Sequence, residues 1–194
     1  MKALTFVDTH GNITAIKKLV KLSEKADLII CAGDLTNFGA DLNKLLKILK
    51  QTNKTLLIIH GNHETEQQLK QAEKKFKFIK FIHNKLYIKD NYAFFGYGGG
   101  GFEQEDKALE KLIPKIKTQI KNKTFTFITH QPPYNTKLDK INGQNTGSKS
   151  ILKFIKELKP KFNICGHLHE NISKKDKISK TFILNPGFGK LINL

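Results

Sequence analysis

Short apolar runs alternate with amphipathic stretches along the first third of the chain. Three runs, at residues 3–7, 27–31 and 55–59, are compact, rich in β-branched residues and bounded by polar or glycine turns, a pattern typical of buried strands. Between them, apolar residues recur at helical spacing, first from Ile13 to Val20 and then from Leu42 to Leu49. This order of elements predicts parallel strands joined by right-handed crossovers.

The later part of the chain is richer in predicted strands. A further helix is expected at residues 64–75, and an apolar stripe at 109–120 predicts a helix that Pro114 kinks or divides. Ser148 is expected to cap a helix that ends before Pro160. The strands expected here are residues 78–82, 86–89, 92–96, 124–129, 162–165, 181–184 and 189–192. The whole pattern predicts an α/β fold in which two mixed sheets lie face to face, flanked by helices.

Length and cysteine content narrow the class of protein. The 194 residues suit one domain, spanning 1–194, with a substantial core. Neither Cys31 nor Cys165 belongs to a Cys-x-x-Cys pair, so we expect free buried thiols. We find no signal peptide and no apolar stretch near the ~20 residues that span a bilayer, and we therefore expect a cytoplasmic protein without a membrane partner.

The net charge of +17 comes entirely from lysine, because the chain contains no arginine. Such a charge can attract phosphate-rich partners, including nucleic acid. It can equally reflect a compositional bias toward lysine scattered over solvated helix faces. We favour the second interpretation, since specific nucleic-acid binders commonly use arginine for bidentate contacts. Nucleic acid is thus a possible partner, but not the favoured one.

Metal-competent residues follow five of the predicted strands, where each strand ends. They are Asp8 and His10, Asp34, Asn62 and His63, His130, and His167 and His169. Ligands collect at the carboxyl ends of strands in open α/β sheets, so we expect these residues to converge. If strand geometry persists, Asp8 and His10 project to the same side. Imidazole, carboxylate and amide ligands suit Mn, Fe, Co, Ni or Zn better than Mg or Ca.

The order of these motifs resembles a known family. Asp8-x-His10, Gly33-Asp34, Gly61-Asn62-His63-Glu64, Thr129-His130 and Gly166-His167-x-His169 match the signature of calcineurin-like metallophosphoesterases. The chain is most similar to small archaeal and bacterial members of the phosphodiesterase-like kind. The resemblance implies a four-layer α/β/β/α sandwich, in agreement with the two sheets expected from the hydrophobic pattern.

The resemblance also implies a role for each residue. Asp8, His10, Asp34 and His169 would hold one metal ion, and Asp34 would bridge to a second ion held by Asn62, His130 and His167. Asn62 and His63 would contact the substrate phosphate, and His63 would protonate the leaving oxygen. The two divalent ions, with Mn favoured over Fe, Ni, Co or Zn, would activate a bridging hydroxide for in-line attack on phosphorus.

Three functions are compatible with these motifs. The leading one is hydrolysis of a small phosphomonoester or phosphodiester, with the diester favoured. An Mre11-like nuclease is the alternative within the enzyme class, although 194 residues leave little room for an additional DNA-capping region. A non-catalytic scaffold on the same fold is the third, but the chain keeps every ligand position and His63. The motifs leave the oligomeric state open.

Other candidates are less specific. Residues 96–101 fit the pattern G-x-G-x-x-G. No acidic residue at a strand end ~20 positions later supports a dinucleotide site. We therefore expect a loop that borders the metal site, with Phe102 as a substrate contact. Tyr134 either stacks on a ring of the substrate or belongs to a rigid turn. The remaining candidates are Glu64 and Glu170 as supports of neighbouring ligands or as solvated carboxylates, His60 as a support or a strand end, and His83 as a structural residue.

Overall fold

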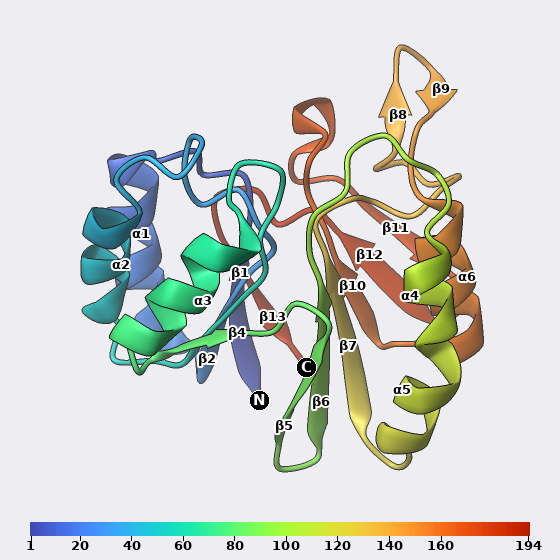
Figure 1. The fold of residues 1–194 in the computed structure, drawn as a ribbon, viewed down its shortest axis with the longest axis horizontal. Coiled ribbons are helices and arrows are strands. Elements are labelled where there is room, and N and C mark those ends of the chain that lie inside the picture. The colour runs from blue at the N-terminus through green and yellow to red at the C-terminus, as the bar shows by residue number, and fades with distance from the viewer.

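Two β-sheets pack face to face at the centre of the molecule, and each has three helices on its outer side. The computed structural model describes all residues from 1 to 194. Figure 1 shows α1, α2 and α3 covering the sheet of the N-terminal half, and α4, α5 and α6 covering the other sheet. The predicted fold class, two mixed sheets flanked by helices in four layers, is therefore confirmed.

The first sheet has the strand order β13-β1-β2-β3-β4. Strands β1 to β4 are parallel, and β13 pairs with β1 in the antiparallel direction. The second sheet has the order β11-β12-β10-β7-β6-β5, with antiparallel strands at both edges. The strands are β1 (Lys2–Phe6), β2 (Leu28–Cys31), β3 (Leu56–Ile58), β4 (Ile79–Phe81), β5 (Lys85–Lys89), β6 (Tyr92–Tyr97), β7 (Thr124–Thr129), β10 (Phe162–Ile164), β11 (Lys175–Ile178), β12 (Thr181–Leu184) and β13 (Lys190–Asn193).

The apolar runs form strands because both faces of each sheet are covered. Along β2, Leu28 and Ile30 pack between the two sheets, whereas Ile29 and Cys31 pack against the outer helices. A third apolar cluster fills the space between the second sheet and its own helices. A strand buried on both faces has a continuous apolar sequence, which explains why these strands could be predicted.

Capping side chains and a proline determine where three of the helices begin. Thr65 and Gln68 form a capping box at the start of α3, and the Ser148 hydroxyl accepts from the amide of Ile151 at the start of α6, as predicted. The stripe near Pro114 is divided into two helices, with the proline in the first turn of the second. The helices are α1 (Ile13–Leu22), α2 (Leu42–Lys50), α3 (Glu66–Lys75), α4 (Lys107–Lys111), α5 (Ile113–Gln119) and α6 (Lys149–Leu158).

Three expectations need correction. The edge strand β11 and the small hairpin of β8 (Lys140–Ile141) and β9 (Gln144–Asn145) were not predicted. Helix α3 begins at Glu66, which leaves Glu64 outside the helix. Strand β1 ends at Phe6, so the alternation of a strand does not extend to Asp8 and His10. None of the helices has the length and apolarity needed to cross a bilayer.

Candidate functional site

The eight predicted site residues come together at the carboxyl ends of β1, β2, β3, β7 and β10. The imidazole Nε2 atoms of His10 and His63 each lie 3.9 Å from Oδ2 of Asp34. The Nε2 atom of His130 lies 3.3 Å from the same oxygen. The loops that carry these residues meet at the upper end of the two sheets in Figure 1. Asp34 is thus at the centre of the cluster.

Three further contacts complete the arrangement. The Nε2 atoms of His10 and His169 are 2.9 Å apart. The amide oxygen of Asn62 lies 3.0 Å from Nε2 of His130 and 3.0 Å from Nδ1 of His167. The sequence expectation that all five strand ends converge on one edge is therefore met.

Backbone conformation, not strand alternation, brings Asp8 and His10 to the same place. Both residues have positive φ angles, of 52° and 43° respectively. Asp34 and His167 also adopt positive φ, at 52° and 71°. Residues other than glycine seldom adopt this conformation, and such residues gather at functional sites. Four of the eight cluster residues share it.

The loop that carries Asp34 is held by a buried carboxylate. Glu64 accepts hydrogen bonds from the backbone amides of Asp34 (3.1 Å) and Thr36 (2.7 Å) and from the Thr36 hydroxyl (2.6 Å). Gly61 approaches Asp34 so closely that a side chain at position 61 would overlap its carboxylate. Gly166 packs in the same way against Asp8, with 2.6 Å between an added Cβ and Oδ2. The glycines of the motifs therefore permit the close packing of the cluster.

The two buried aspartates differ in pKa. Burial raises the pKa of Asp8 to about 6. Burial acts in the same direction on Asp34, but the hydrogen bond and charge of His130, with the backbone amide and charge of His63, outweigh it and hold the pKa of Asp34 at about 2. Asp34 is thus ionised across the whole physiological range.

The donor set fits a transition-metal centre. Nδ1 of His130 contacts the carbonyl oxygen of Ala32 at 3.0 Å, which requires a proton on Nδ1 and turns Nε2 toward Asp34 and Asn62. Oδ1 of Asp8 and Nε2 of His167 are buried and have no hydrogen-bond partner. Unpartnered buried ligand atoms are costly unless a cation satisfies them. Three groups could hold an ion: Asp8, His10 and His169; His10, Asp34 and His63; and Asp8, Asp34 and His130.

His63 lies at the edge of the cluster. The amide of Phe38 donates a long hydrogen bond, of 3.4 Å, to its Nδ1. This contact favours the tautomer with the proton on Nε2, the nitrogen that faces Asp34. His63 is therefore able to present a proton toward the cluster, although its position also permits metal ligation.

The secondary candidates divide into two groups. Glu64 supports the Asp34 loop, as expected, whereas Glu170 is exposed and forms no hydrogen bond or ion pair with a cluster residue, which favours the interpretation as a solvated carboxylate. Tyr134 lies against Lys149 and is held in a turn by the carbonyl of Ser148, which favours the turn interpretation.

The glycine-rich run forms a loop that packs against His60 and His83. The carbonyl of His60 accepts from Gly99, and Nδ1 of His83 accepts from Gly98. The ring of Phe102 then reaches His167, with centroids 5.3 Å apart. The loop therefore borders the cluster, as expected, and His60 and His83 support the loop without joining the cluster.

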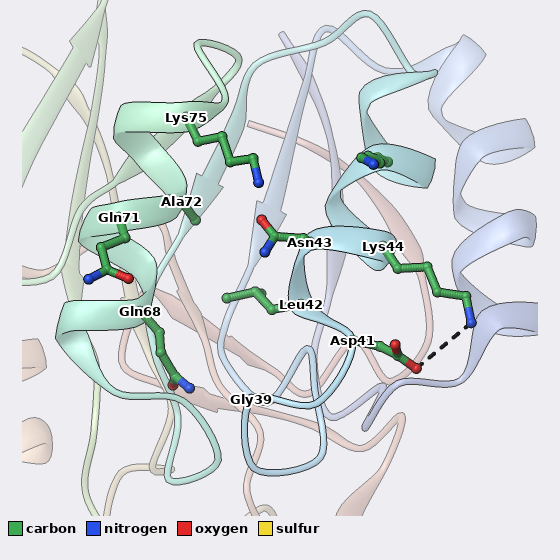
Figure 2. A pocket seen from close by; sticks show the side chains of 10 residues that line it. Gly39, Asp41, Leu42, Asn43, Lys44, Gln68, Gln71, Ala72 and Lys75 are labelled. Carbon is green, nitrogen blue, oxygen red and sulfur yellow. Dashed lines mark ion pairs between the residues drawn. The ribbon is translucent and has the colours of Figure 1, made fainter.

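A separate cleft lies outside the histidine cluster, between α2 and α3. Figure 2 shows this cleft of about 690 Å³, which is lined by polar and lysine side chains including Lys44, Lys47 and Lys75. Asp41 is the single carboxylate that lines the cleft, and it forms an ion pair with Lys44 at 3.8 Å. No histidine lines the cleft. The cleft therefore lacks a set of metal ligands, and the candidate metal ligands lie in the histidine cluster.

Replacing Asp8 with asparagine is expected to stabilise the metal-free protein at pH 8. Because folding raises the pKa of Asp8 from 3.8 to about 6, its contribution to stability becomes unfavourable as the pH rises from about 4 through 6 and reaches up to about 3 kcal/mol above that range. Asparagine keeps an acceptor for the amide of His167 but carries no charge. Thermal unfolding in chelator should show a midpoint about 5 °C higher at pH 8. At pH 4 the gain should shrink, and a less stable variant at pH 8 would contradict the assignment.

Replacing Glu64 with alanine is expected to destabilise the fold by about 2–4 kcal/mol, because three buried donors lose their acceptor. Replacement by glutamine should cost less, since one oxygen can still serve Thr36. Urea unfolding measures both effects. If alanine and glutamine variants unfold at the same urea concentration as the parent, Glu64 does not hold the loop.

Comparisons with known proteins agree with this geometry. The family model described as calcineurin-like phosphoesterase matches residues 1–171. An uncharacterized protein of Methanocaldococcus jannaschii is 30% identical over 197 residues, covering 96% of this chain and 88% of the relative.

Solved structures show the same fold. Protein TT1561 of Thermus thermophilus superposes with a TM-score of 0.74 at 20% identity, covering 96% of this chain and 88% of that one. An archaeal phosphodiesterase superposes with a TM-score of 0.53 at 17% identity, covering 96% and 84%. With a family match over most of its length and a cluster of candidate metal ligands at the expected strand ends, the chain belongs to the calcineurin-like phosphoesterase family, whose members imply a dinuclear divalent metal site.

Proposed function

We propose that this protein is a metal-dependent phosphodiesterase acting on small substrates. The single observation that carries the proposal is the position of Asp34, whose carboxylate lies within 4 Å of the ring nitrogens of His10, His63 and His130. A carboxylate at the centre of two ligand sets is what a dinuclear site requires. The phosphodiesterase named among the structural neighbours adds support by its fold, not by its substrate.

The proposed ligands follow from the contacts. Asp8, His10 and His169 would hold one ion together with Asp34, in line with their mutual proximity. Asn62, His130 and His167 would hold the second ion together with Asp34. Two bound ions supply a nucleophile at neutral pH and neutralise charge on the phosphoryl oxygens. Mn fits the mixed nitrogen and oxygen donors, as do Fe, Co, Ni and Zn.

Side chains of the protein would orient the substrate and protonate the leaving group. Asn62 and His63 would orient the phosphate, and Nε2 of His63 would transfer a proton to the oxygen of the leaving alcohol. The hydrogen bond from the amide of Phe38 supports this tautomer of His63. Buried Glu64 keeps the Asp34 loop fixed, so the ligands need little rearrangement when an ion binds.

An Mre11-like nuclease is the second candidate. It is favoured by the lysine-lined cleft, which adjoins the loop after Asp34 through Gly39. A scaffold without activity is disfavoured, because an incomplete ligand set would be expected and this set is complete.

A panel of four substrates tests the proposal. Protein loaded with Mn should be given an aryl monoester, an aryl diester, a cyclic nucleotide and single-stranded DNA. We expect the aryl diester and the cyclic nucleotide to be hydrolysed fastest and the chelator-treated protein to be inactive. Preferential cleavage of DNA would support the nuclease, and absence of both bound metal and hydrolysis would support the scaffold.

A further inference from the structure

Two exposed phenylalanines, which come from different parts of the chain, contact the histidine cluster. Phe38 belongs to the loop between β2 and α2, and 75% of its surface is exposed. Phe102 belongs to the loop between β6 and α4, and 63% of its surface is exposed. Each half of the molecule thus contributes one large apolar ring beside the site.

Each ring contacts a different histidine. Phe38 stacks on His63, with centroids 4.2 Å apart and ring planes inclined by 27°. Phe102 approaches His167 at 5.3 Å with planes inclined by 53°. Since most of the surface of each residue is exposed, both retain accessible surface that a further ring can cover. Isolated exposed apolar residues need no explanation, but two that both contact site histidines form a pattern.

The backbone of Phe38 is held in an unfavourable conformation. Its φ angle is +50°, in the left-handed region that a bulky side chain seldom adopts. Its amide donates to His63, the same side chain on which its ring stacks. A strained aromatic residue that stays exposed beside a reactive group points to a ligand contact.

We propose that Phe38 and Phe102 select phosphoesters whose organic group carries a flat aromatic ring, the class to which nucleobases belong. The proposal rests on the phosphoesterase function proposed above and specifies its substrate. Aromatic rings stack on other rings in offset or edge-to-face arrangements, which saturated groups of equal size cannot match. Neither phenylalanine is a metal ligand, so their effect should fall on substrate binding.

A binding experiment tests the proposal without turnover. Calorimetry on the Mn-loaded protein should compare benzylphosphonate with cyclohexylmethylphosphonate, which are non-hydrolysable and differ in the flatness of the ring. We expect benzylphosphonate to bind about tenfold more tightly. The Phe38→Ala and Phe102→Ala variants should each lose most of this preference, whereas Phe38→Tyr keeps it. The matched control is Phe182→Ala, an exposed phenylalanine that packs on Phe162 away from the site.

A second pair of ligands separates failure of this inference from failure of the proposed function. Adenosine 2′,3′-cyclic phosphate and glycerol 1,2-cyclic phosphate share one five-membered cyclic diester, with and without a flat ring. We expect the alanine variants to raise KM about tenfold for the first compound alone. Equal losses on both compounds, or equal binding of the two phosphonates, would overturn the inference while hydrolysis stands. Ring-dependent binding without any hydrolysis would sustain the inference and overturn the proposed function.

Discussion

Replacing Asp34 with asparagine is expected to lower phosphodiester hydrolysis by about 10³-fold or more. Loss of one preorganised electrostatic group in an active site typically costs 10²–10³-fold, and Asp34 would serve two ions at once. Its low pKa, of about 2, means that the parent carries a full negative charge there at every working pH. Asparagine removes that charge while nearly preserving the shape of the side chain.

A matched control exists in the same loop. Asp41 also has a positive φ angle, of 56°, but it is exposed and makes no capping hydrogen bond with its side chain. The Asp41→Asn variant should keep the activity and metal content of the parent. Steady-state rates with an aryl diester and metal analysis of the dialysed proteins provide the measurement. Hydrolysis by Asp34→Asn within tenfold of the parent would exclude a bridging role.

Replacing His63 with alanine is expected to have the second largest effect, and the effect should depend on the leaving group. A positioned general acid contributes about 10²–10⁴-fold when the leaving alcohol is a poor one. An activated aryl leaving group needs little protonation, so the loss should be much smaller there. Rates for an alkyl and a nitrophenyl ester of the same phosphate, measured side by side, give the comparison.

Metal content distinguishes the two positions that His63 can serve. Its ring lies close enough to His10 and Asp34 to act as a ligand. If it is the acid, the alanine variant should still bind two ions per chain. Equal losses on both esters, or the loss of one ion, would remove the acid assignment.

Most of the architecture could be predicted because the strands are buried on both faces. Strand β7, at Thr124–Thr129, was predicted with its observed bounds, since helices cover one face and the other sheet covers the other. Strand β11 carries the sequence KDKI and pairs only with β12 at a sheet edge. Because its lysines are exposed, this strand contains no apolar run and could not be predicted from the hydrophobic pattern.

The site was predicted by residue type and order, but its geometry was not. The motifs identified all eight cluster residues, whereas the positive φ angles of Asp8 and His10 depend on loops that no periodicity describes. The three hydrogen bonds of Glu64 likewise require the β2–α2 loop to fold against β3. Phe38 gave no signal beyond its place four residues after Asp34, because stacking on a histidine depends on tertiary structure.

The most direct test of the central claim is a titration of the metal-free protein with Mn, with hydrolysis of an aryl diester as the readout. The arrangement of two ligand sets around Asp34 predicts no activity at the start and a rate that rises until two equivalents per chain have bound. Full activity in the presence of chelator, or saturation of binding at one equivalent with full activity, would contradict a dinuclear phosphoesterase.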